Sequence, residues 1–330
     1  MAAYNQYEHG IIRIKVPVPF PLQWVNAYVL QEEAGYTIVD PGLNTEQARE
    51  LWLNVMEELR IELKQIRKTV LTHHHPDHYG LAGWMQELTN CEVYISSAGH
   101  SLVNRLWGEG ETLTDELCAL FARHGLPVDK QQLMYDHMKS FIPLVSPQPT
   151  EVKHLEEGDV WRAGELNFRT LSLSGHAYSH LIFLDERNKL MLCGDHVLPR
   201  ISPNISYLPD EDPDPLHSFL EGLDKLAGCG EMEAVYPGHR DPFRDLPGRV
   251  EELKAHHERR LQQIADLLHQ PASAHEVCMA MFGKRLSTHQ LRFAMSETIA
   301  HLVYLEQRQN IQAEQRGDML VYTRIRTFPV

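Results

Sequence analysis

Hydrophobic and polar positions alternate in two different periods along the first hundred residues. Segments 10–20 and 26–42 are rich in β-branched and aromatic residues and end in Pro and Gly, which predicts strands and turns. Apolar residues then recur at three- and four-residue steps, which predicts an amphipathic helix over 46–60 capped by Asn44 or Thr45. A short strand over 69–72, a helical stripe from Leu81 to Leu88 and a strand over 91–96 follow. This order favours a mixed fold of helices and sheets.

Residues 99–145 interrupt the alternation. Their apolar positions have helical spacing, and prolines end the segment. We interpret it as a helical insertion that either packs on the surface or forms a lid over a pocket.

The last 85 residues form a separate pattern. A long helix is predicted over 249–269, and Ser273 with Glu276 forms a capping box that opens a second helix. A third apolar stripe runs from Leu291 to Leu305, and a hairpin turns near Gly317 and Asp318. Three helices and a hairpin are typical of a winged-helix domain. We therefore divide the chain into 1–245 and 246–330.

Charge and cysteine content limit the class of protein. The net charge is −14, and residues 246–330 carry 11 basic against 9 acidic side chains, which leaves 20 against 36 for residues 1–245. Such an acidic balance over residues 1–245 disfavours general nucleic-acid binding. Five scattered cysteines without a C-x-x-C pair, no signal-like N-terminus and no apolar run of membrane-spanning length predict a cytoplasmic protein that does not enter a membrane.

The candidate chemistry lies at the ends of predicted strands. The sequence HHHPDH at 73–78 follows the strand over 69–72. His176, Asp195 and His239 follow predicted strands over 166–173, 188–193 and 233–236, and a glycine precedes each of them. Glycine lets the backbone turn sharply, and strand ends hold side chains rigidly around a common pocket.

Imidazole and carboxylate groups together bind borderline divalent metals. Seven such ligands exceed what one ion can use with room left for substrate, whereas two ions with one bridging aspartate can use them. In an extended loop His73 and His75 point the same way, so His74 is left out of the site, and His196 beside Asp195 is left out for the same reason.

These residues resemble the motifs of the metallo-β-lactamase superfamily. HHHPDH fits H-x-H-x-D-H, SGHAYSH is similar to G-H-T-x-x-H, and LCGDHV and YPGH resemble the later G-D and G-H segments. The resemblance covers about residues 11–245. It implies an α+β, four-layer αββα sandwich, here with a helical insertion and a winged-helix-like C-terminal domain. In DHYGLAG, Leu81 replaces the family's second glycine.

The resemblance also implies the ligand sets. His73, His75 and His176 would hold one metal, Asp77, His78 and His239 the second, and Asp195 would bridge them. Asp40 would be a supporting carboxylate. The cofactor expected is two divalent ions, zinc before iron or manganese. A hydroxide between them, oriented by Asp77 and Asp195, would attack a carbonyl or phosphoryl centre.

Several substrates remain open. We expect a small acyl substrate: a thioester, ester or lactone. The tail resembles that of some bacterial hydrolases and of a mitochondrial β-lactamase-like ribonuclease, so RNA is the alternative. Mononuclear iron dioxygenases share H-x-H-x-D-H. Diiron relatives replace the second histidine, which this chain keeps as His75.

The third tail helix offers the basic residues Arg292, His301 and Arg308 but also two glutamates, so nucleic acid is not the favoured partner. We expect the tail to pack, to form a homodimer or to wall the cleft. Two candidate substrate contacts are Tyr207, in the Pro- and Ser-rich loop after Asp195, and His180, in the G-H-T-x-x-H-like segment.

Overall fold

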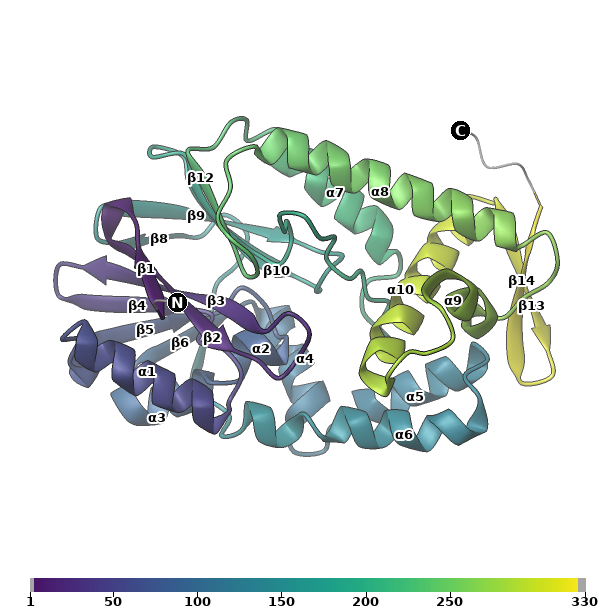
Figure 1. The fold of residues 1–330 in the computed structure, drawn as a ribbon, viewed down its shortest axis with the longest axis horizontal. Helices are drawn as coiled ribbons and strands as arrows, with labels where there is room; N and C mark the ends of the chain where they lie inside the picture. The colour runs from purple at the N-terminus through teal and green to yellow at the C-terminus, as the bar shows by residue number, and fades with distance from the viewer. Residues whose placement is uncertain (1–2, 326–330) are drawn as a thin grey trace.

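Two β-sheets form the centre of the computed structural model, which describes residues 3–325 (Figure 1). The first sheet has, in spatial order, β1 (Tyr4–Gln6), β2 (Ile11–Pro17), β3 (Trp24–Glu32), β4 (Gly35–Val39), β5 (Ile66–Val70), β6 (Glu92–Ile95) and β7 (Val152–His154). The second has β12 (Ala234–Pro237), β11 (Leu190–Gly194), β10 (His180–Asp185), β9 (Leu166–Leu173) and β8 (Val160–Ala163). Strands β4 to β7 are parallel, as are β11 and β12, and the other neighbours are antiparallel.

An apolar layer joins the facing surfaces of the two sheets. Tyr28 and Val39 from the first sheet belong to one buried cluster with Phe168, Phe183 and Leu192 from the second. Strand β10 is buried along its whole length because it lies in the interior of its sheet, between β9 and β11. This apolar layer holds the inner face of one sheet against the inner face of the other.

Helices cover the outer faces of both sheets (Figure 1). Helices α1 (Glu46–Glu58) and α3 (Ala82–Thr89) pack on the first sheet, and α7 (Pro215–Ala227) packs on the second beneath α8 (Leu246–Leu267). The Thr45 hydroxyl caps α1 by accepting from Ala48 N at 3.1 Å. The predicted four-layer order of helix, sheet, sheet and helix is therefore confirmed.

The insertion and the tail lie together at one end of the molecule (Figure 1). The insertion forms α4 (Ser97–Trp107), α5 (Leu113–Arg123) and α6 (Val128–Lys139). The tail continues from α8 through α9 (Ala274–Phe282) and α10 (Thr288–Gln307) to the hairpin of β13 (Ile311–Arg316) and β14 (Met319–Arg324). Helix α10 packs against α6, α7, α8 and α9, so one apolar core runs from the sheets into the tail. The remaining short elements are α2 (Pro76–Tyr79) and the 3-10 turns Glu8–Gly10, Leu63–Gln65 and Ile142–Val145.

Most predicted elements are present, with some omissions. The helical insertion, the three tail helices, the Ser273–Glu276 capping box and the hairpin turn at 317–318 are observed. The winged-helix assignment and the division at residue 245 stay predictions. Strands β1, β7, β8 and β10 and helix α7 were not predicted. Within residues 3–325, no helix combines the length and the apolarity that crossing a bilayer requires.

The continuous core predicts that a tail residue stabilises the whole fold. Leu302 on α10 is fully buried, so Leu302→Ala should lower the free energy of unfolding by about 2–5 kcal/mol. Leu53 on α1 is 46% exposed, and Leu53→Ala should change it by less than about 0.5 kcal/mol. Urea unfolding of both variants measures the difference, and equal effects would contradict the packing described.

Candidate metal centre

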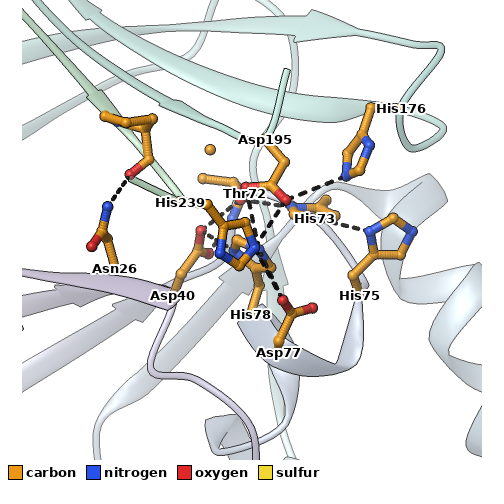
Figure 2. A network of polar contacts seen from close by, with 12 residues as sticks. Asn26, Asp40, Thr72, His73, His75, Asp77, His78, His176, Asp195 and His239 are labelled. Atoms are coloured by element: carbon orange, nitrogen blue, oxygen red, sulfur yellow. Dashed lines mark hydrogen bonds and ion pairs between the residues drawn. The ribbon is translucent and has the colours of Figure 1, made fainter. Parts of the chain in front are cut away.

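The predicted ligands meet at one edge of the sandwich, where strands of both sheets end. Strands β4, β5, β9, β11 and β12 end at this edge, and the loops or the short helix α2 that follow them carry the ligand-type side chains, as Figure 2 shows: Asp40, His73, His75, Asp77, His78, His176, Asp195 and His239. Leu181 N donates to Thr72 O at 2.7 Å, and Gly238 N donates to Gly194 O at 2.7 Å. The first bond ties the motif loop of the first sheet to β10 of the second sheet, and the second bond joins the ends of β11 and β12 within the second sheet.

The glycines before the ligands serve two different purposes. Gly175 and Gly194 have positive φ angles of 119° and 47°, as the sharp turns predicted from the sequence require. Gly238 is needed for space instead: a Cβ atom there would lie 2.2 Å from Asp195 Oδ1 and 2.6 Å from His78 Cε1. A side chain at position 238 would push the ligands apart.

Three imidazoles form the first group. The Nε2 atom of His73 lies 3.0 Å from Nδ1 of His75, and the ligand atoms of His73, His75 and His176 all lie within 4.8 Å of one another. His73 and His75 thus point to one place, as their alternation with His74 predicted. The geometry suits one divalent ion bound by three nitrogens.

The second group combines imidazoles with carboxylates. Asp77 Oδ2 lies 3.2 Å from His239 Nε2 and 3.9 Å from His78 Nε2. Asp195 lies between the two groups: its oxygens are 3.5 Å from His78 Nε2, 3.3 Å from His239 Nε2 and 3.7 Å from His176 Nε2. The carboxylate of Asp195 is therefore placed where it could reach two ions.

The second nitrogen of four ligand histidines is held by the fold. His176 Nδ1 donates to Asn204 O at 2.8 Å, and His239 Nδ1 donates to Trp24 O at 2.9 Å. A carbonyl oxygen can only accept, so these protons lie on Nδ1 and each Nε2 faces the centre, where it can bind a metal once it carries no proton. His73 Nδ1 lies 2.9 Å from Thr72 Oγ1, and His78 Nδ1 lies 2.9 Å from Asp40 Oδ2.

Asp40 orders the loop that carries the motif. Its Oδ1 accepts from Thr72 N at 2.8 Å, and its Oδ2 accepts from Thr72 Oγ1 at 2.7 Å as well as facing His78. Because the Thr72 hydroxyl donates to Asp40, it accepts from His73. Both carboxylate oxygens are thus engaged, which fits the supporting role expected for Asp40.

Buried polar atoms at the centre fit a metal. His78 Nε2, His176 Nε2 and Asp195 Oδ1 are buried, and within residues 3–325 none of them has a hydrogen-bond partner. Buried groups of this kind are costly unless something compensates them. A divalent cation would satisfy the imidazole lone pairs and the carboxylate together.

The two groups differ in charge. Burial, reinforced by the neighbouring imidazoles, holds the pKa of His73 and His75 well below the ordinary value, so these rings are neutral. Burial alone would lower the pKa of His239, but Asp195 and Asp77 outweigh it and raise that pKa to about 10. Burial opposes ionisation of Asp195, yet His239 and His78 hold its pKa well below the usual range. Two ionised carboxylates therefore favour protonated imidazoles in the second group, and a divalent cation would take the place of those protons.

The centre opens into a cleft of about 440 Å³. His75, Asp77, His176, Asp195 and His239 line its polar end. The other walls come from the loop after β2, the loop after β11, the residues following α6, and α9 and α10. The tail thus walls the cleft, which is one of the roles expected for it, and the insertion contributes Phe141.

The structure does not bring the two candidate substrate contacts into the cleft. His180 is fully buried behind the site, where its Nε2 accepts from Asp195 N at 3.1 Å and its ring stacks on His73. Tyr207 is half-buried against α10, and its backbone oxygen accepts from Ser296 Oγ at 2.8 Å. His180 is placed to orient Asp195, and Tyr207 to attach its loop to the tail.

The two histidines left out of the site lie outside both ligand groups. The ring of His74 lies 4.7 Å from that of His75 and 6.4 Å from that of Trp107, and the ring of His196 packs on Phe219 at 5.0 Å. Burial lowers the pKa of each to about 3, so both are neutral packed side chains.

Sequence reasoning missed residues that position the ligands. Asn26 donates to Pro237 O at 2.9 Å and to Arg240 O at 2.6 Å, which holds the His239 loop (Figure 2). Its one sequence signal is a polar residue inside an apolar strand. Asn204, whose carbonyl holds His176, donates from Nδ2 to Glu297 Oε2 at 2.8 Å. Glu297 is also paired with Arg260 of α8, so the tail braces a ligand of the first group.

Comparison with known families gives two matches along the chain. The metallo-beta-lactamase superfamily matches residues 24–239, and the metallo-beta-lactamase-like C-terminal domain matches residues 261–325. The first match contains all the predicted ligands, and the second covers the whole of α9, α10 and the hairpin together with the end of α8.

Individual relatives agree with this assignment. A metallo-beta-lactamase family protein of Thermus thermophilus is 32% identical, with a TM-score of 0.85 over 96% of this chain and 99% of that one. The probable metallo-hydrolase YqjP of Bacillus subtilis is 27% identical over 94% of this chain and 97% of its own length. The hydroxyacylglutathione hydrolase GloC of Haemophilus influenzae is 26% identical over 51% of this chain and 63% of its own length. On this sequence match and this shared fold, the chain belongs to the metallo-beta-lactamase superfamily of metal-dependent hydrolases.

Proposed function

We propose that the protein is a dinuclear metal-dependent hydrolase of small acyl substrates, meaning thioesters, esters or lactones. The observation that carries the proposal is the pair of ligand groups that share Asp195 at the floor of one cleft. His73, His75 and His176 would hold one ion, Asp77, His78 and His239 the other, and Asp195 would bridge them. The mixed imidazole and carboxylate set favours zinc, with iron or manganese as alternatives.

Two bound divalent ions would acidify a water molecule toward neutrality and polarise the substrate carbonyl. The chain's own residues orient the reaction. Asp77 and Asp195 are ionised, face the centre and can accept hydrogen bonds from the water, which fixes the direction of its attack. Asn204 and the Trp24 carbonyl hold His176 and His239 in place, so the ligands need little rearrangement during turnover.

The cleft supports a small substrate over RNA. Its volume lies within the range of small-molecule sites. The basic residues expected to face nucleic acid, in α10 and just after it, do not form a continuous face: Arg292 lines the cleft, His301 is fully buried, and Arg308 pairs with Asp214 at 2.8 Å. A ribonuclease would need a basic track for the phosphate backbone. The relative named hydroxyacylglutathione hydrolase supports an acyl substrate as well.

Two further proposals concern the protein's surroundings. We propose a cytoplasmic location, in keeping with five cysteines that are all free. A homodimer through the C-terminal helices is the assembly we expect, and gel filtration with light scattering would measure it.

Metal analysis after gel filtration tests the ligand sets. Asp195→Ala should lose at least one of two ions per chain and reduce activity by at least about 100-fold, because it removes the bridging carboxylate. His74→Ala is the control, since His74 lies outside both groups, and it should keep both ions. The ligand assignment is wrong if His74→Ala loses as much metal as His75→Ala. One iron per chain in the wild type would instead favour the mononuclear dioxygenase.

A direct comparison of substrates tests the reaction. Metal-loaded protein should hydrolyse members of a panel of thioesters, esters and lactones, and Asp195→Ala should abolish this turnover, because the shared carboxylate organises the centre. A labelled single-stranded RNA, assayed in parallel, should remain intact. RNA cleavage that Asp195→Ala abolishes, together with a silent acyl panel, would make the protein a ribonuclease.

A further inference from the structure

One cation in the wall of the cleft has no acidic partner. Arg292, on α10, lines the same cleft as Asp77 and Asp195. Within residues 3–325 its guanidinium makes no hydrogen bond and no ion pair, and it lies 4.6 Å from the ring of Phe293 and 5.8 Å from that of Phe141. Two other arginines of the tail, Arg260 and Arg308, also lie over aromatic rings, but they are paired with Glu297 and Asp214. Arg292 therefore stands out as a cation held by aromatic rings alone.

The cleft offers Arg292 no free carboxylate. Glu297 also lines it, but its two oxygens already contact Arg260 and Asn204. Asp77 and Asp195 face the ligand histidines. Burial lowers the pKa of Arg292 to about 10, with Asp77 acting against it, so the side chain keeps its charge at neutral pH. A partly buried, unpaired guanidinium is costly in the free protein and gains most from an anion that enters with the substrate.

The wall around Arg292 is apolar and aromatic. Phe20, Phe141, Phe282 and Phe293 line the cleft, and Phe20 stacks on His289 with ring centroids 4.8 Å apart. Burial lowers the pKa of His289 to about 4, so this ring is neutral and adds no second positive charge. The cleft thus combines a metal-binding floor with an apolar wall that carries the guanidinium of Arg292.

We infer that Arg292 binds a carboxylate on the acyl substrate, and that the apolar part of the same substrate lies against the phenyl rings. This inference rests on the proposed function, because it names the substrate class of the same site. A guanidinium presents a planar fork of donors that matches a carboxylate, and its stacking on the phenyl rings orients that fork before the substrate arrives. The substrate is then an acyl compound that is both anionic and apolar.

A binding experiment tests Arg292 without relying on hydrolysis. Calorimetry with metal-loaded protein would compare phenylmethanesulfonate, an anion that is a weak metal ligand, with the neutral benzyl methyl sulfone. The wild type should bind the sulfonate at least about 10-fold more tightly, the range expected for a hydrogen bond to a charged group. Arg292→Met should remove this preference. The matched control Arg285→Met removes an exposed positive charge that does not line the cleft, and it should keep the preference.

A matched substrate pair tests the same residue in turnover. The thiophenyl monoester of glutaric acid carries a free carboxylate, and its methyl ester does not. Arg292→Met should lower kcat/KM for the acid by about 10- to 100-fold, mainly through KM, and leave the methyl ester within about 3-fold. Equal losses on both substrates, or no loss on either, would overturn the inference. If Arg292→Met does not fold with its full metal content, Arg292→Gln replaces it in the same kcat/KM comparison, with the same expected result.

The two experiments separate the inference from the function on which it rests. If the sulfonate preference depends on Arg292 but no thioester is hydrolysed, the anion site stands and the acyl-hydrolase proposal fails. If thioesters are hydrolysed but neither the sulfonate nor the free carboxylate is preferred, the hydrolase stands and the role of Arg292 is refuted.

Discussion

An imidazole can present one lone pair to a metal ion only when its other nitrogen carries the proton, and this structure arranges that condition repeatedly. His176 and His239 donate to backbone carbonyls, His78 faces Asp40, and His73 donates to Thr72. These acceptors are the carbonyl oxygens of Asn204 and Trp24, the carboxylate of Asp40 and the hydroxyl of Thr72. The remaining nitrogens and two ionised carboxylates then converge on a centre where divalent cations could bind in place of the imidazole protons.

The two-sheet scaffold makes this convergence possible. The segments that carry the ligands leave strands of both sheets at the same side of the sandwich. The apolar layer between the sheets holds the two sheets against each other there. The absence of a side chain at Gly238 lets the His239 loop approach Asp195 and His78 closely. Packing in the layer between the sheets thus sets distances at the centre.

The C-terminal helices complete the site. Arg260 and Glu297 reach Asn204, whose carbonyl orients His176, and α9 and α10 supply much of the cleft wall. The tail is therefore joined to the catalytic part by a buried polar chain and by a continuous apolar core. Without the tail, the cleft would lack the wall formed by α9 and α10. The first ligand group would also lack the contact through which Glu297 holds Asn204.

The sequence by itself determined the residues most directly tied to chemistry and to local order. Ligand identity and spacing in HHHPDH, the glycines before three later ligands and the periodicity of the helices are local properties, readable over a few positions. Helix α7 was missed although Leu216, Phe219, Leu223 and Leu226 have helical spacing, and β10 was missed because a strand buried on both faces shows no alternation. Only the tertiary structure decided how Asn204, Glu297 and His180 support the ligands and where Arg292 lies in the cleft. The residues that these side chains contact are distant in the sequence. The spacing of residues along the chain does not tell which side chains are buried or which of them form hydrogen bonds.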